Sequence, residues 1–222
     1  EMEYWKYNLK QTADNAQQGN DLAVNFTAVF PTPVLTFTDE KGINLPEMDY
    51  INNLDYIDNF ANQTTVHTAV LQNKKLKRLE AWIYKALERY VQEVYAPEED
   101  VDLKITQSWC NKSLPGQSHH AHCHPNSLVS GVYYVQTTDE DKITFLKQDF
   151  SQLRIETNSF NSFNSLSWWL PAEQGTLVLF PSTLQHHVKE VVGTQARISL
   201  SFNTFPSGPL GNKRSLTQLE IK

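Results

Sequence analysis

Histidine is concentrated in one short stretch of this chain. Four of the seven histidines lie within residues 117–126, whose sequence is Gln-Ser-His-His-Ala-His-Cys-His-Pro-Asn. Two of the other three are adjacent, at His186 and His187. Imidazole is the commonest protein ligand for metals of intermediate softness, and it titrates near neutral pH. The spacing therefore predicts a metal centre that joins this stretch to the distant histidine pair.

Strand geometry suggests which of these side chains share a face. Side chains at i and i+2 of a strand point the same way, so His122 and His124 form one candidate pair. His120 has the same parity, which leaves His120 with His122 as a second pair. Cys123 falls between them and is predicted to point away. A third ligand from another strand would complete a facial site with open positions, the geometry of non-haem Fe(II) oxygenases. The plainer alternative is a histidine-rich surface loop that traps metal incidentally.

Length and composition limit the classes of protein that fit. A chain of 222 residues predicts an N-terminal arm over 1–27 and a single domain over 28–222. The net charge of -6, with no basic run, argues against nucleic acid or anionic membrane as a partner. We find no secretory segment and no apolar run of membrane-spanning length. With only Cys110 and Cys123, the expected compartment is the reducing cytoplasm. The sequence gives no oligomeric state.

Hydrophobic periodicity predicts one strong helix followed by strands. Apolar residues recur at steps of three and four from Leu76 to Val94, so one stripe of this helix must pack on another element. A short helix is also expected near Leu54 to Phe60. From Val101 the period becomes two, which places Leu103, Ile105 and Trp109 on one face. Further strands are predicted over 28–37, 127–136, 143–146, 176–180 and 196–205. This order favours a mainly β sandwich or barrel with helices packed on its outer face.

Two segments have more than one interpretation. In the last strand, Arg197 and Ser199 alternate with Ile198 and Leu200, so the polar face either meets water or lines a barrel interior that holds a small charged ligand. An arginine there would bind a carboxylate in bidentate fashion. The polar residues 150–169 are a candidate substrate-facing rim, which would include Trp168 and Trp169; simple core packing of the two tryptophans is the alternative.

Several motifs, taken in order, resemble a known family. They are Trp109-Cys-Asn111, His122-Cys-His124-Pro-Asn126, Ser130-Gly-Val-Tyr-Tyr134, Gly175-Thr-Leu-Val-Leu-Phe-Pro-Ser182, His186 and Arg197-Ile-Ser-Leu-Ser-Phe-Asn203. Over about residues 28–205 the chain resembles the 2-oxoglutarate–Fe(II) oxygenases, in a group with a His-x-His-Pro-Asn-Ser start that is related to the prolyl-hydroxylase-like branch. The resemblance implies a double-stranded β-helix, also called a jelly roll or cupin-like fold.

The resemblance also implies roles for particular residues. The iron ligands map to His122, His124 and His186, and His186 is preferred to His187 by its spacing. Arg197 maps to the residue that holds the distal carboxylate of 2-oxoglutarate. Tyr134 matches a tyrosine that often assists this arginine in the family. Ser199 and Asn111 are further candidates for the same pocket. The implied activity is a dioxygenase that uses Fe(II), 2-oxoglutarate and O₂ to hydroxylate a peptidyl or small-molecule substrate.

One feature departs from the family pattern. Most such oxygenases carry His-x-Asp or His-x-Glu where this chain has His122-Cys-His124. A carboxylate lowers the net charge of a metal site, whereas a third imidazole does not. Two alternatives therefore stay beside the 2-oxoglutarate hydroxylase: a three-histidine cupin dioxygenase that uses no oxoacid, and a non-catalytic cupin-like binding module.

Overall fold

The computed structural model describes residues 27–138, 140–148, 153 and 155–222. The chain divides into two units, Glu1–Thr32 and Pro33–Lys222, and the second contains all the helices and strands among the described residues. The predicted arm, 1–27, lies outside the described residues apart from Thr27. Its boundary with the predicted domain over 28–222 stays a prediction.

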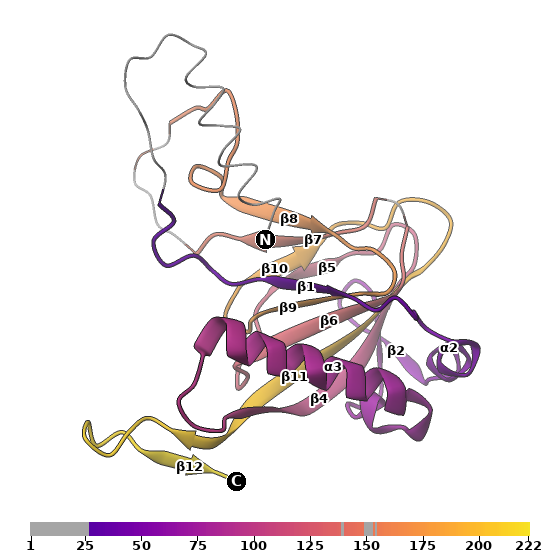
Figure 1. The fold of residues 1–222 in the computed structure, drawn as a ribbon. Helices are drawn as coiled ribbons and strands as arrows, with labels where there is room; N and C mark the ends of the chain where they lie inside the picture. The colour runs from indigo at the N-terminus through magenta and orange to yellow at the C-terminus, as the bar shows by residue number, and fades with distance from the viewer. Residues whose placement is uncertain (1–26, 139, 149–152, 154) are drawn as a thin grey trace. The chain divides into compact units, whose positions relative to one another are not determined.

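The larger of two antiparallel sheets contains eight strands within the described residues. Seven lie in the order β1-β9-β6-β11-β4-β3-β2, and β12 pairs with the end of β11 (Figure 1). The strands are β1 (Leu35–Thr38), β2 (Tyr56–Asp58), β3 (Gln63–Thr65), β4 (Asp102–Ser113), β6 (Val129–Gln136), β9 (Thr176–Pro181), β11 (Arg197–Leu210) and β12 (Leu219–Ile221). Pro31 and Pro33 precede β1 and have no backbone N–H to donate. Because β1 lies at an edge of the sheet, strand pairing does not need these donors.

The smaller sheet faces the larger one. Among the described residues it has four strands in the order β5-β10-β7-β8. They are β5 (His119–His122), β7 (Lys142–Leu146), β8 (Ser167–Pro171) and β10 (His186–Val188). The chain passes from one sheet to the other after β4, β5, β6, β8, β9 and β10, whereas β7 and β8 follow one another within the smaller sheet. The predicted mainly β jelly roll is confirmed.

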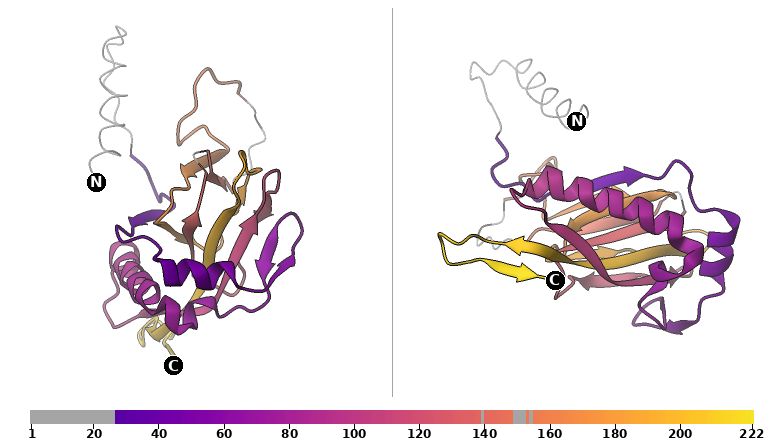
Figure 2. Two further views of the ribbon diagram at one scale, coloured as in Figure 1. Left: turned by 90° about the vertical axis from the view of Figure 1, so that its right-hand side faces the viewer. Right: turned by 60° about the horizontal axis from the view of Figure 1, so that its bottom comes forward.

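Helices cover the outer face of the larger sheet, as predicted (Figures 1 and 2). The predicted helix over 76–94 is α3 (Lys77–Tyr90), which continues as a π-helix over Val91–Tyr95 and is preceded by 3-10 turns at Val70–Gln72 and Lys74–Leu76. Along α3, Leu79, Ile83 and Leu87 are fully buried against the sheet, and each contributes about 1.5–3 kcal/mol. None of the described helices is long and apolar enough to cross a membrane.

The helix predicted near Leu54 to Phe60 is wrong. Residues 56–58 form β2, and the helix lies earlier, as α2 (Leu45–Asn52). Asn44 caps it: its side chain accepts from the backbone N of Glu47 at 2.9 Å, and the Glu47 carboxylate accepts from the backbone N of Asn44 at 3.0 Å. This reciprocal capping box fixes the start of α2 and is the signal that the periodicity did not reveal.

One arginine joins α3 to the segment around α2. The guanidinium of Arg78 donates to Asp39 at 2.8 Å and to both carboxylate oxygens of Glu47 at 2.9 Å. Asp39 also accepts from the hydroxyl of Tyr133 at 3.1 Å. Hydrogen bonding to Glu47, with a further contribution from Asp39, raises the pKa of Arg78 above its ordinary value although burial opposes this. These contacts fix helix α3 on the outer face of the larger sheet.

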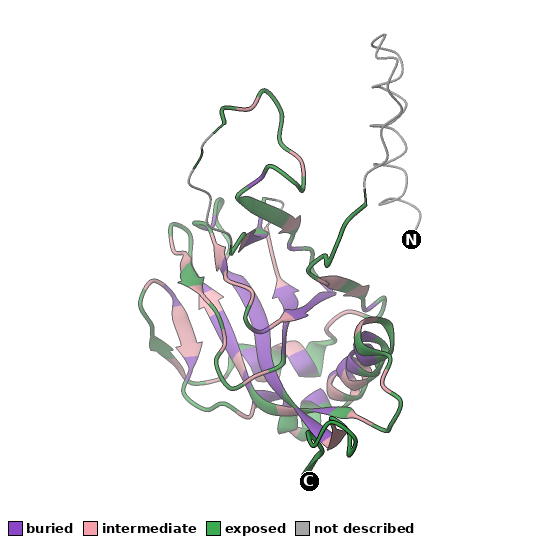
Figure 3. Ribbon diagram, turned by 90° about the vertical axis from the view of Figure 1, so that its left-hand side faces the viewer, coloured by how far each residue is buried: buried purple, intermediate pink, exposed green. Residues whose placement is uncertain are grey.

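The middle strands of the larger sheet are buried on both faces, and Figure 3 shows them in purple. Its outer face packs under α3 through residues such as Tyr133, Leu200 and Phe202. Its inner face packs on the smaller sheet through an apolar cluster that includes Phe145 and Phe180. The ring of Phe202 packs directly over Gly131, because a β-carbon there would lie 2.1 Å from Cζ of Phe202.

A β-bulge in β4 corrects the predicted alternation. Asn203 pairs with Gln107 and Thr204 pairs with Ile105, so Thr106 is an extra residue. An extra residue reverses the faces of all later side chains in the strand. Leu103 and Ile105 pack on the outer side with the helices, whereas Trp109 faces the other way, so the prediction that all three share a face is wrong.

Candidate metal and oxoacid site

A pocket lies between the two sheets, lined from both sides. The larger sheet supplies residues of β4, β6 and β11, and the smaller sheet supplies residues of β5, β7 and β10. The lining residues are Trp109, Asn111, Ser113, His119, His122, His124, Val132, Tyr134, Ile143, His186, Val188, Arg197, Ser199 and Ser201. The seven residues to which the family resemblance gave roles are all among them, whereas the candidate rim residues Trp168 and Trp169 are not. The polar face of the last strand therefore lines an interior, and the water-facing interpretation is wrong.

Three imidazoles converge at one place in this pocket. One ring nitrogen from each of His122, His124 and His186 lies within 4.8 Å of the others. The Nε2 atoms of His124 and His186 are 3.4 Å apart. Two nitrogens bound at a right angle to one ion, each at about 2.1 Å, would be about 3.0 Å apart. The three residues can therefore ligate one metal ion with small side-chain adjustments.

Backbone carbonyls orient two of these rings. Nδ1 of His122 lies 2.8 Å from the carbonyl oxygen of His120, and Nδ1 of His186 lies 3.0 Å from that of Leu184. Since a carbonyl only accepts, Nδ1 is the protonated nitrogen in both rings. The lone pair of each ring is then on Nε2. This tautomer suits a metal ligand.

Burial keeps the imidazoles neutral at physiological pH. Desolvation lowers the pKa of His186 to about 3 and that of His124 to about 4, and it also lowers the pKa of His122. Each charged ring would further repel its neighbours. The nitrogen lone pairs are therefore available to a metal at pH 7 without competition from protons.

A β-bulge in β5 decides which histidines face the pocket. His186 pairs with His122 and Val188 pairs with His119, so β5 has one residue more than β10 between these pairs. His119 and His122 therefore lie on one side, with rings stacked at 4.5 Å, and His120 is exposed. The predicted shared face of His120 and His122 is wrong.

His124 reaches the cluster from a turn. It follows the end of β5, so the expectation that His122 and His124 alternate along one strand is also wrong. Asn126 has φ 57°, a left-handed conformation that asparagine tolerates. The backbone N of His124 donates to Ser182 O at 2.9 Å. The Ser182 hydroxyl contacts those of Ser127 at 2.7 Å and Ser130 at 2.8 Å, which fixes the His-Pro-Asn-Ser turn to β9 and β6.

Polar groups of the larger sheet form the opposite wall. Across the strands, Ser199 pairs with Asn111 on β4 and with Tyr134 on β6, which brings these three side chains to one place. The Tyr134 hydroxyl is buried without a hydrogen-bond partner among the described residues. Burial raises the pKa of Tyr134 above its ordinary value. An unpaired buried hydroxyl is costly, so a ligand oxygen at this position would satisfy it.

Arg197 is buried in the same pocket and already has protein partners. Its Nη1 lies 3.3 Å from Oδ1 of Asp141, and its Nη2 donates to the Ser113 hydroxyl at 3.1 Å. Burial lowers the pKa of Arg197, and the carboxylate of Asp141 opposes this effect. Arginine stays charged in proteins, so a cation faces the pocket with a carboxylate beside it.

Sequence reasoning missed several residues in or beside the pocket. Asp141, the buried partner of Arg197, lies in a turn, where no pattern indicated burial. Ser113 could have been found from Asn111 by its i+2 spacing on β4. His119 was not among the predicted ligands. It lies outside the three-histidine cluster but lines the pocket, and burial lowers its pKa to about 3.

Cys123 points away from the cluster and is exposed. We therefore expect Cys123→Ser to bind as much iron as the original protein. Metal analysis after anaerobic reconstitution with Fe(II) tests this, with His124→Ser as the matched control one residue away, which should lose its metal. Iron loss in Cys123→Ser would contradict the assignment.

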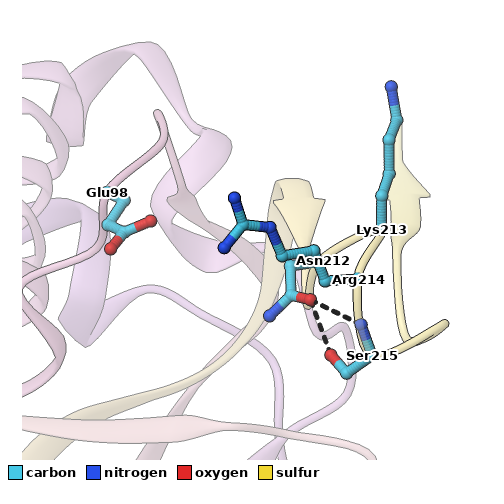
Figure 4. A pocket seen from close by; sticks show the side chains of 5 residues that line it. All are labelled: Glu98, Asn212, Lys213, Arg214 and Ser215. Atoms are coloured by element: carbon cyan, nitrogen blue, oxygen red, sulfur yellow. Dashed lines mark hydrogen bonds between the residues drawn. The ribbon is translucent and has the colours of Figure 1, made fainter.

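A second hollow lies at the turn between β11 and β12 (Figure 4). Its lining residues are Glu98, Asn212, Lys213, Arg214 and Ser215, and all are exposed. Asn212 Oδ1 accepts hydrogen bonds from the backbone N of Ser215 at 2.8 Å and from its hydroxyl at 2.6 Å, which closes the turn. The hollow is therefore a feature of the turn that joins β11 to β12.

Comparison with known proteins gives a family match and a set of structural neighbours. Residues 107–203 match a family model described as "Putative 2OG-Fe(II) oxygenase". No protein with a curated description matches the chain. A 2OG-Fe(II) oxygenase family oxidoreductase from Burkholderia pseudomallei has 13% identity and a TM-score of 0.54, with 87% of this chain and 89% of that one covered.

Two further neighbours were solved with bound molecules. HygX from Streptomyces hygroscopicus, with nickel, 2-oxoglutarate and hygromycin B bound, has 12% identity and a TM-score of 0.54, with 78% of this chain and 82% of that one covered. A Trichoplax adhaerens prolyl hydroxylase, in complex with a hypoxia inducible factor oxygen degradation domain peptide fragment, has 11% identity and a TM-score of 0.53, with 92% and 93% covered. At these identities the neighbours establish the fold alone.

Proposed function

We propose that the protein is a 2-oxoglutarate–Fe(II)-dependent dioxygenase that hydroxylates a peptidyl or small-molecule substrate, and the match of residues 107–203 to the family model supports this proposal. The observation that carries the proposal is one pocket with three neutral, convergent imidazoles and a buried arginine. The imidazoles suit a transition metal, and the arginine suits a carboxylate of a chelating acid. Fe(II) and 2-oxoglutarate would supply the activation of dioxygen.

In this proposal His122, His124 and His186 hold the metal. The carbonyls of His120 and Leu184 keep two of the rings in the ligating tautomer. With three protein ligands, the remaining coordination positions stay open to the oxoacid and to dioxygen. The apolar neighbours of the cluster, such as the Phe180 ring 4.7 Å from that of His186, exclude water from it.

The polar wall holds the oxoacid. Arg197 and the unpaired hydroxyl of Tyr134 donate to its distal carboxylate, and Ser199 and Asn111 line the path between this end and the histidines. Asn111 Nδ2 donates to the Ser201 hydroxyl at 3.2 Å, which fixes the orientation of the amide. The donor set fits a small dicarboxylic acid, because it offers one cation and neutral donors in a buried site.

Turnover of 2-oxoglutarate without a substrate tests the proposed function. The Fe(II)-loaded protein should convert 2-oxoglutarate to succinate slowly, and His186→Ala should not. Dioxygen consumption that depends on an added organic substrate and yields no succinate would favour a three-histidine dioxygenase that uses no oxoacid. Metal binding with neither product nor dioxygen consumption would favour a binding module.

Trp168 is the residue of the predicted rim that we propose contacts the substrate. Trp168 and Trp169 are 46% and 53% exposed, so core packing is wrong for both. Trp168 pairs with Phe145, whose ring centroid lies 6.2 Å from that of His186. Trp169 pairs with Thr144 on the other face, and Lys142 Nζ lies 4.4 Å from its ring centroid.

We expect Trp168→Ala to reduce the use of substrate and Trp169→Ala to leave it unchanged. The assay is the increase in succinate formation when candidate peptides or small molecules are added. Loss of a stacked aromatic contact would raise KM by about ten-fold, without changing the rate in the absence of substrate. Equal effects of the two variants would contradict this assignment.

The substrate class stays open between a peptide and a small molecule, since one neighbour binds hygromycin B and another binds a peptide fragment. We propose a cytoplasmic location because Cys110 and Cys123 are free thiols. Nucleic acid and membrane are not proposed partners, on the grounds of net charge.

A further inference from the structure

The charge of Arg197 is shared with a buried carboxylate before any cosubstrate binds. The Arg197 side chain is 5% exposed and that of Asp141 is 2% exposed, and their nearest atoms are 3.3 Å apart. Asp141 and Ser113 occupy Nη1 and Nη2 respectively. A guanidinium has five N–H donors, so donors remain for a second anion, but that anion would lie beside Asp141.

Asp141 is held in place from several directions. Its Oδ2 accepts from the backbone N of Thr138 at 2.8 Å. Its backbone N donates to Thr138 O at 3.2 Å, and its backbone O accepts from Ala172 N at 2.9 Å. The carboxylate is therefore part of the turn between β6 and β7 and cannot swing away when a ligand enters.

The two charges cancel at this end of the pocket. The three ligating imidazoles are neutral, so a metal ion brings positive charge only to the opposite end. The distal carboxylate of an oxo-dicarboxylate would meet a cation that already has an anionic partner, and it would feel repulsion from Asp141. The repulsion between Asp141 and the chelating end of the same ligand would be much weaker, because the chelating end lies at the metal.

We propose that Asp141 sets the cosubstrate selectivity of this pocket: by neutralising Arg197, it weakens the preference for an oxo-dicarboxylate over an oxo-monocarboxylate. The proposal rests on the function proposed above. It makes Asp141 a positioning residue that acts through Arg197.

Asp141→Asn tests the proposal, since asparagine keeps the size and one acceptor oxygen while removing the charge. We would measure by calorimetry, on Mn(II)-loaded protein, the Kd of 2-oxoglutarate and that of 2-oxobutyrate, which lacks the distal carboxylate. The variant should bind 2-oxoglutarate at least about five-fold more tightly than the original protein does. Its Kd for 2-oxobutyrate should be unchanged. Asp141→Glu keeps the charge and should behave as the original protein does.

Asp39→Asn is the matched control. Asp39 is also a buried carboxylate paired with an arginine, Arg78 at 2.8 Å, but Arg78, unlike Arg197, is not among the residues that line the pocket. This variant should unfold at a lower temperature and leave both dissociation constants unchanged.

The result that overturns the proposal is a 2-oxoglutarate Kd in Asp141→Asn that is unchanged or weaker, or an equal gain for both oxoacids. If that variant does not fold, the two dissociation constants of the original protein test the proposal. A Kd for 2-oxobutyrate that is no more than about ten times the Kd for 2-oxoglutarate supports it. A larger ratio overturns it. Original protein that binds Mn(II) but neither oxoacid would instead sink the proposed function, and this inference with it.

Discussion

Replacing His186 with alanine will remove nearly all Fe(II) from the protein, and His122→Ala and His124→Ala will do the same. Each variant takes one of three protein ligands from the site, and no carboxylate belongs to the cluster of described residues that could replace it. The loss should exceed the roughly 10–100-fold that follows from changing an outer neighbour. Bound metal, measured after anaerobic reconstitution and desalting, tests the prediction.

The other histidines of the region are the controls. His120→Ala and His187→Ala should keep their metal. His119→Ala is the most demanding control, because its ring stacks on that of His122 at 4.5 Å and lines the same pocket. If His119→Ala loses the metal while His124→Ala keeps it, the ligand assignment is wrong. A His124→Asp variant, with the family's usual carboxylate, should still bind Fe(II).

Replacing Arg197 with alanine will abolish measurable 2-oxoglutarate binding. Losing a charged partner of a carboxylate in a desolvated site costs about 2–5 kcal/mol, which is a weakening of roughly 30-fold to several thousand-fold. Calorimetry on the Mn(II)-loaded variant measures the effect. An unchanged 2-oxoglutarate Kd would remove Arg197 from the cosubstrate site.

The same substitution also affects the fold, for a reason that the sequence did not reveal. It leaves the buried carboxylate of Asp141 without its partner, and breaking a buried ion pair from one side costs about 3–5 kcal/mol. The double variant Arg197→Gln/Asp141→Asn removes both charges and separates the two effects. It should be more stable than Arg197→Ala and should bind 2-oxoglutarate more tightly than Arg197→Ala does, but more weakly than the original protein does.

The sequence by itself determined the residue types of the site and the elements that carry them. The apolar stripe from Leu76 to Val94 required a packed helix, because a period of 3.6 makes one continuous face. The alternation from Arg197 to Asn203 required a strand with one polar and one apolar face. His122, His124 and His186 were selected by residue type, spacing and motif order, and the structure brings these three together.

Only the tertiary structure decided which side chains meet. The extra residues in β4 and β5 are set by their pairing with β11 and β10, and a strand's own periodicity cannot contain a register that another strand imposes. One bulge turned Trp109 toward the pocket, and the other turned His119 inward. Asp141 contacts Arg197 across 56 residues of sequence, and this contact exists only because the fold brings the turn between β6 and β7 beside the first residue of β11.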